Sequence, residues 1–134
     1  MKFVKLLALR PNNWYLNHEK LKRVRMAWKS GEQDALPPVL VTEIDGELSL
    51  IDGHSRAYAA YERGETHIKA DVCELEKIEG SNALYRYIHR EGPKLGVNTI
   101  ADLRNRILPP DEHRRLWTGY CDNWIVENEN TSDN

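Results

Sequence analysis

The sequence predicts a mixed α/β (α+β) sheet with helices, followed by a helical C-terminal segment. Two strand-like runs, residues 39–44 and 47–51, are separated by Asp45-Gly46, a pair that favours a two-residue type I′ hairpin. The second run passes directly into a helical pattern that ends at Gly64, and alternating apolar residues resume over 68–72. Strand, helix and strand in this order predict a parallel, right-handed crossover.

The N-terminal third adds a strand and a helix. Residues 3–9 predict a short first strand that residues 10–13 (Arg-Pro-Asn-Asn) break. A helix is expected from about Asn17, with one apolar face formed by Leu21, Val24 and Trp28. The rest of this helix includes five basic residues: Lys20, Lys22, Arg23, Arg25 and Lys29. Such a run is typical of the solvated side of an amphipathic helix, and the alternative is contact with a phosphate backbone.

The second half of the chain predicts helices packed on the sheet. We divide the chain into an α/β core over residues 1–76, a helical segment over 77–126 and a disordered polar tail over 127–134. Thr99 and Asp102 have the spacing of a capping box. The last helix carries Leu116, Trp117, Tyr120, Cys121 and Trp124. At helical spacing these residues indicate a core or an oligomer interface, such as that of a homodimer, and not a base-stacking platform.

Composition narrows the classes of function. The net charge of −2 gives no general attraction to nucleic acid or acidic membranes, and no apolar run is long enough to span a bilayer. Cys73 and Cys121 follow no ligand spacing, and with no export signal in view we expect reduced thiols and a cytoplasmic location. The five histidines form no metal signature.

Residues 52–56, Asp-Gly-His-Ser-Arg, form the candidate site. His54, Ser55 and Arg56 should occupy the first turn of a helix that begins where a strand ends, and the first amides of a helix have no intrahelical acceptor. Gly53 lets the backbone approach a ligand, and Arg56 adds a cation suited to phosphate. The alternative is an ordinary turn with Gly53 at the bend, Asp52 or Ser55 as N-cap and Arg56 in solvent.

The run Ile-Asp-Gly-His-Ser-Arg-Ala-Tyr-Ala-Ala, residues 51–60, resembles the ParB/sulfiredoxin superfamily, in which a strand leads into a helix through Gly-x-x-Arg. The resemblance covers about residues 36–72. The whole chain is also similar to small bacterial ParB-like proteins without a settled function. The shared segments there are Asp-Leu-x-x-Arg-Ile at 102–107 and the Trp-to-Asp stretch at 117–122.

The resemblance implies a site for a nucleotide (ATP, ADP or CTP) with Mg²⁺. Gly53 would admit the phosphates, Arg56 would pair with them, and His54 and Ser55 would offer amides or side chains. Asp52 would hold the phosphate-bound Mg²⁺ or else serve the turn. His54 and Asp52 are also the candidate catalytic residues, and the alternative for His54 is a neutral ring hydrogen-bonded at the turn.

Departures from the superfamily pattern limit the chemistry. His54 stands where sulfiredoxin has its reactive cysteine, so that route to phosphotransfer is excluded. The Asp-Gly-His-x-Arg run is closer to that of a free serine kinase, which also needs a carboxylate base, and Glu19 and Glu43 are candidates. The residues after the third strand are too few for both a helix-turn-helix domain and a dimerisation tail. No carboxylate cluster for two-metal cleavage is visible.

Three functions follow as hypotheses. The first is nucleotide binding at residues 53–56, with phosphotransfer or hydrolysis left open. The second is a DNA-associated partition or nuclease module, which requires the basic side of the 20–29 helix to lie beside Gly53 and binding that weakens steeply with salt. The third is a ligand-free interaction domain that uses the Trp-bearing C-terminal helix.

Overall fold

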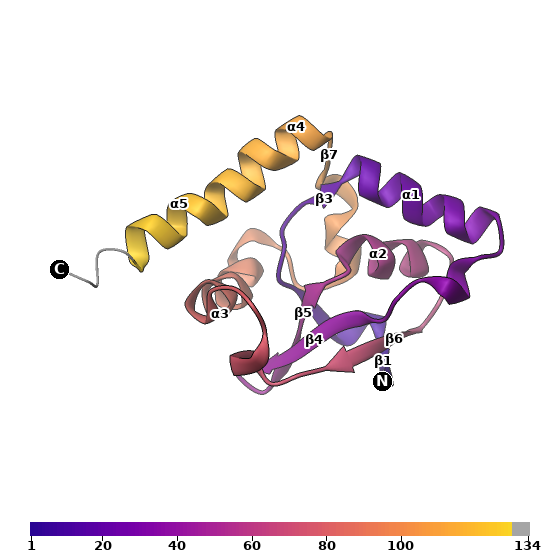
Figure 1. The fold of residues 1–134 in the computed structure, drawn as a ribbon, viewed down its shortest axis with the longest axis horizontal. Coiled ribbons are helices and arrows are strands. Elements are labelled where there is room, and N and C mark those ends of the chain that lie inside the picture. Colours follow the sequence, from indigo (N-terminus) through magenta and orange to yellow (C-terminus); the bar gives the residue numbers. More distant parts are fainter. Residues whose placement is uncertain (130–134) are drawn as a thin grey trace.

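A five-stranded mixed sheet, covered by helices, forms the body of the computed structural model, which describes residues 1–129 of the chain. The strands lie in the order β1-β6-β4-β5-β2, with the bounds β1 Lys2–Lys5, β2 Leu9–Pro11, β4 Val39–Ile44, β5 Glu47–Asp52 and β6 His67–Val72. A separate parallel pair is formed by β3 Leu16–Asn17 and β7 Ile107–Leu108. The helices are α1 His18–Lys29, α2 His54–Glu62, α3 Asn82–Glu91, α4 Pro110–His113 and α5 Gly119–Asn128. The expected fold class is confirmed (Figure 1).

Local turn chemistry forms the hairpin and the strand-to-helix junction as predicted. Asp45 and Gly46 have φ values of 55° and 79°, so both central residues are left-handed, as a type I′ turn between β4 and β5 requires. Strand β5 ends at Asp52, and α2 begins at His54 with only Gly53 between them. The direct passage from strand to helix is therefore confirmed.

The expected parallel crossover from β5 through α2 to β6 is wrong. Strand β6 pairs in parallel with β4, and β4 is antiparallel to β5, so β6 runs opposite to β5. The hairpin has already reversed the chain, and α2 returns it to the far side of β4, between β4 and β1. The parallel neighbour of β5 is β2 instead. The carboxyl ends of β2 and β5 consequently lie side by side.

The N-terminal strand is also shorter and more broken than predicted. A 3₁₀ turn at Leu6–Ala8 divides it into β1 and β2, and it places Leu6 in the core. Arg10 and Pro11 belong to β2, so the strand ends after Pro11 and not before Arg10. Because β2 is an edge strand, the hydrogen bond that proline cannot donate is not needed there.

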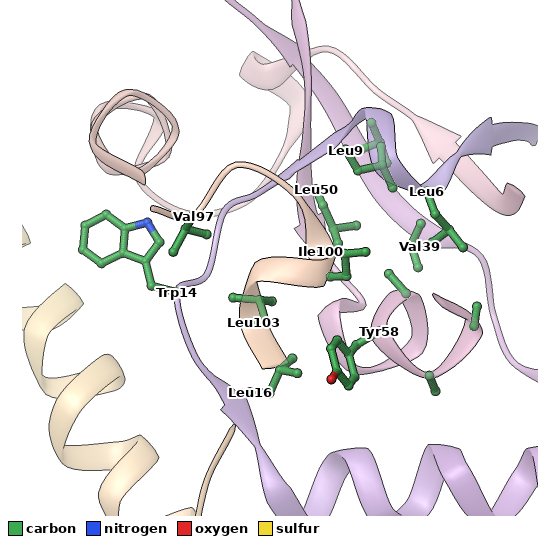
Figure 2. Close-up of a cluster of buried hydrophobic side chains, with 14 of the residues drawn as sticks. Leu6, Leu9, Trp14, Leu16, Val39, Leu50, Tyr58, Val97, Ile100 and Leu103 are labelled. Carbon is green, nitrogen blue, oxygen red and sulfur yellow. The ribbon is translucent and has the colours of Figure 1, made fainter. Parts of the chain in front are cut away.

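Helix α2 packs on the sheet, and α1 lies next to it (Figure 1). Asn17 caps α1 by accepting hydrogen bonds from the amides of Glu19 and Lys20, and Leu21 is fully buried. The core extends into the C-terminal half. Figure 2 shows Ile100 and Leu103 of the 3₁₀ segment Ile100–Asn105 among core residues of the sheet and α2. The predicted capping box is present, and Asp102 Oδ2 accepts from the Thr99 amide at 2.9 Å.

The last helix continues from α4 through a π-helical turn, Arg114–Thr118, into α5. Trp117 is in the core, with its ring centroid 5.2 Å from that of Trp14, and Trp124 packs on Tyr87 at 5.1 Å. The helix includes residues 127 and 128, which we had placed in a tail, and residues 130–134 lie outside the described part. Within residues 1–129, no helix has the length and apolar character needed to cross a membrane.

Candidate functional site

A cleft of about 360 Å³ opens at the carboxyl end of β5. One wall is the strand-to-helix turn, residues 51–56, together with Pro37. The other wall comes from the segment between Asn13 and Val24, which includes the first two turns of α1, and from His113 of α4. The cleft thus joins the predicted motif to parts of the chain far from it in sequence.

Gly53 meets two separate requirements of the turn. Its φ of +100° is a conformation that side-chain-bearing residues rarely adopt. A Cβ atom there would lie 2.6 Å from Val39 Cγ1 and 2.9 Å from Arg56 Nη2. Since Val39 is completely buried, it has little freedom to move away. Glycine is therefore required by the packing beneath the turn, independently of any ligand.

The N-terminus of α2 has no side-chain cap among the described residues. The first hydrogen bond of the helix runs from the Ala57 amide to the Gly53 carbonyl at 2.9 Å. The amides of residues 54–56 precede it and have no intrahelical acceptor. The N-cap is Gly53, so the alternative that Asp52 or Ser55 caps the helix is not seen. Unpaired amides and the helix dipole make this end of α2 favourable for an anion.

Arg56 is held along the cleft wall and does not extend into solvent. Nη1 donates to the carbonyls of Pro37 at 2.8 Å and Pro38 at 3.2 Å, and Nη2 donates to Asp52 Oδ2 at 3.2 Å. Its side chain is 15% exposed. The two carbonyls orient the guanidinium group, and Asp52 offsets part of its charge. Neither the bonds to the two carbonyls nor the bond to Asp52 involves Nε of Arg56.

His54 is buried under the turn. Its Nε2 accepts a hydrogen bond from the Asn12 amide at 3.0 Å, and burial lowers its pKa to about 4. The ring is therefore neutral at pH 7, and it forms a second hydrogen bond with the Leu50 backbone. A buried ring that is already hydrogen-bonded to Asn12 and Leu50, and whose pKa is low, is a poor general base, so the structure gives no support to a catalytic role. That role stays a prediction.

Asp52 is the single carboxylate among the residues that line the cleft, and its side chain is 75% exposed. Glu19 lies on the first turn of α1 but is not part of the lining, and Glu43 borders a different cavity beside the β4–β5 turn. Within residues 1–129 no group of three or more metal-ligating side chains is present. One exposed carboxylate suits an Mg²⁺ ion that arrives with phosphate ligands, but not a site built from protein ligands alone.

The structure adds residues that motif-based reasoning did not assign to the site. Lys20 and Arg23 of α1 line the cleft opposite the turn. Of the five basic side chains of α1, only Arg25 forms an ion pair within the described residues, with Glu62 at 2.6 Å. The basic run in the sequence was the signal for Lys20 and Arg23, although it could not show where they point. Nothing in the sequence indicated His113.

The charge balance of the cleft differs from that of the whole chain. Lys20, Arg23 and Arg56 face one carboxylate, Asp52. Burial, and to a smaller extent the nearby Lys20 charge, lowers the pKa of His113, which disfavours its charged form. The cleft is consequently cationic on a protein whose net charge is −2. A small anion of matching size is the ligand that this arrangement favours.

Comparisons with known proteins identify the fold but no family. No protein-family model matches the chain, and no curated protein is similar enough to count as a match. Among solved structures, the chain is similar to protein Atu1540 from Agrobacterium tumefaciens, with a TM-score of 0.53 and 15% sequence identity over 76% of this chain and 60% of that one. The chain therefore spans 60% of the length of Atu1540. A weaker likeness is to sulfiredoxin from Arabidopsis thaliana, with a TM-score of 0.42 and 22% identity over 66% of this chain and 97% of that one.

At such low identities a structural likeness establishes a shared fold and nothing about activity. The five-stranded mixed sheet with its helices is an α+β fold. We conclude that the chain shares its fold with Atu1540, and that its function has to be argued from the cleft itself.

Proposed function

We propose that this protein binds a nucleoside di- or triphosphate, ATP, ADP or CTP, with its phosphates in the cleft over residues 53–56. The observation that carries the proposal is the convergence of three cationic side chains, Lys20, Arg23 and Arg56, on the uncapped N-terminus of α2. A cleft of about 360 Å³ has the size of a small-molecule site.

The two walls would act on the phosphates in different ways. The turn offers the amides of residues 54–56 and a guanidinium group that Pro37 and Pro38 already hold in place. Because these groups are pre-oriented, little entropy is lost when they bind an anion. Lys20 and Arg23 are exposed, flexible cations on α1 that can adjust to the length of a phosphate chain.

Asp52 is the residue that would hold an Mg²⁺ ion carried by the nucleotide. The ion would neutralise charge on the phosphate oxygens. Without a metal, the Asp52 carboxylate would repel phosphates, although its contact with Arg56 partly offsets its charge. Binding should therefore be tighter with Mg²⁺ present, and Asp52→Asn should reduce that dependence.

Isothermal titration calorimetry with ATP, ADP and CTP, with and without Mg²⁺, tests the proposal. The double variant Lys20→Ala/Arg23→Ala should lower affinity by about tenfold or more, because each removes a charge-assisted contact. Lys22→Ala is the matched control, since Lys22 lies on the same helix but does not line the cleft. An absence of binding by the unaltered protein, or an equal loss in Lys22→Ala, would overturn the proposal. Phosphate release, measured in parallel, tests the further prediction of hydrolysis or phosphotransfer.

DNA association is the second candidate, because two of the five basic residues of α1, Lys20 and Arg23, line the same cleft as the Gly53 turn. Fluorescence anisotropy with a labelled DNA duplex over a range of salt concentrations distinguishes DNA binding from nucleotide binding. Counterion release would make DNA affinity fall steeply with salt, and nucleotide should compete for the same cleft. The third hypothesis, a ligand-free interaction domain, requires an obstructed turn, whereas residues 51–56 line an open cleft.

A further inference from the structure

The C-terminal helix contributes His113 to the same cleft as the strand-to-helix turn. His113 is the last residue of α4, and its amide donates to the Pro109 carbonyl at 2.9 Å. Helix α4 packs against the short strands β3 and β7, which lie beside the cleft. The imidazole is therefore carried by ordered backbone and not by a loose tail.

Tyr15 connects this helix to the cleft. It lines the cleft, its ring lies 6.2 Å from that of Trp117, and the guanidinium carbon of Arg106 is 5.3 Å from its ring centroid. The His113 ring forms a hydrogen bond with the Tyr15 backbone. These contacts position both the aromatic ring and the imidazole from the C-terminal half of the chain.

The protonation state of His113 decides what it can bind. Burial, followed by the neighbouring Lys20 charge, lowers its pKa, whereas the hydrogen bond to Tyr15 opposes this shift. A neutral imidazole has one N–H donor and one acceptor nitrogen. Phosphate oxygens are acceptors, so the free nitrogen must gain a proton before it can donate to one.

We propose that His113 contacts a phosphate oxygen of the nucleotide bound in the cleft and takes up one proton from solvent as the nucleotide binds. This inference rests on the proposed function and deepens it, because it makes the C-terminal helix part of the binding site. The step is a proton transfer: hydronium or the buffer acid gives up a proton, a new N–H bond forms on the imidazole, and this N–H donates a hydrogen bond to the phosphate oxygen.

The charged and titratable groups around His113 agree with proton uptake on binding. Lys20 on α1 and His54 on the turn both interact electrostatically with His113, and Asp52 and Arg56 line the same cleft. On its own helix, Asp111 is almost fully exposed and is in contact with Arg114. In the free protein burial, and to a smaller extent the Lys20 charge, disfavours imidazolium. A bound polyphosphate reverses the sign of the local charge, so it favours imidazolium.

Calorimetry at pH 7 in two buffers of different ionisation enthalpy measures the proton uptake directly. The unaltered protein should take up more protons than His113→Gln, by a difference approaching one per nucleotide. The nucleotide's own phosphate titration is common to both proteins and cancels in this comparison. His113→Gln should bind about tenfold more weakly near pH 6.5, since uptake approaching one proton requires the His113 pKa to rise by about two units on binding, and a rise of that size gives roughly this effect at that pH.

Two further variants separate charge from structure. His113→Lys carries a permanent charge, so it should restore affinity and remove the proton uptake linked to this position. His18→Gln, on the exposed first turn of α1 and outside the cleft, should behave like the unaltered protein. Titration of the histidine Cε1–H signals by NMR, with and without nucleotide, tests the same claim without relying on a variant that folds. The His113 signal should titrate at a higher pH when nucleotide is bound.

Equal proton uptake and equal affinity in the unaltered protein and His113→Gln would overturn this inference. An unchanged His113 titration on nucleotide binding would do the same. In either case a loss of affinity in Lys20→Ala/Arg23→Ala would still support the proposed function. If the unaltered protein bound no nucleotide, both proposals would fall together.

Discussion

Replacing Gly53 by alanine tests how tightly the strand-to-helix turn is packed. The new Cβ would lie 2.6 Å from Val39 Cγ1, on a buried, β-branched side chain in the middle of the sheet. Overpacking of this kind costs about 1–3 kcal/mol, and forcing alanine to the left-handed φ of +100° costs about 1–2 kcal/mol more. We expect the free energy of unfolding to fall by about 2–5 kcal/mol in equilibrium urea titrations.

Gly64, at the other end of the same helix, is the matched control. Its φ is +84°, but a Cβ there would meet no atom within 4 Å. Gly64→Ala should therefore lower the free energy of unfolding only by the cost of the left-handed conformation, about 1–2 kcal/mol. Both variants restrict the unfolded chain to the same extent, so that effect cancels in the comparison. Equal losses of stability in the two variants would refute the close approach of Gly53 to Val39.

Three further predictions concern the elements that shape the cleft. Because burial lowers the pKa of His54 from 6.5 to about 4, the free energy of unfolding should decline as pH falls from 6.5 towards 4, by at most about 3 kcal/mol. In urea titrations at several pH values, His54→Gln should show a weaker dependence on pH. Arg56→Lys cannot reproduce the bonds to two carbonyls and should cost about 1–3 kcal/mol in thermal unfolding; an unchanged melting temperature would contradict their importance. Trp117→Ala should cost about 3–5 kcal/mol, whereas the exposed neighbour Leu116→Ala should cost much less, and similar losses would argue against a buried Trp117.

Local chemistry explains which parts of the fold the sequence could predict. The Asp45-Gly46 hairpin and the start of α2 after Gly53 depend on residues a few positions apart, and both are confirmed. The direction of β6 and the pairing of β2 with β5 depend on contacts between distant segments. Alternation of apolar residues carries no information about which strand lies beside which, so the crossover was predicted wrongly.

The candidate site divides in the same way. The turn motif marked residues 52–56, and their place on one wall of the cleft follows from local geometry. The opposite wall depends on how α1 and α4 pack against the core. The basic run over residues 20–29 indicated Lys20 and Arg23 as candidates. A run of this kind has the same sequence pattern whether it lines a site or only faces solvent. No feature of the sequence indicated that His113 lies at the cleft, because its position depends on how α4, far from residues 52–56 in sequence, packs against the rest of the chain.

The most direct test of the nucleotide site is a ¹⁵N–¹H correlation spectrum recorded as ATP and Mg²⁺ are added. Binding over the N-terminus of α2 predicts that the amides of residues 53–56 shift most, with further changes at Lys20 and Arg23. Changes gathered around a different cavity, such as the one lined by Phe3 and Trp28, would contradict the proposed site, and so would an unchanged spectrum at millimolar ATP.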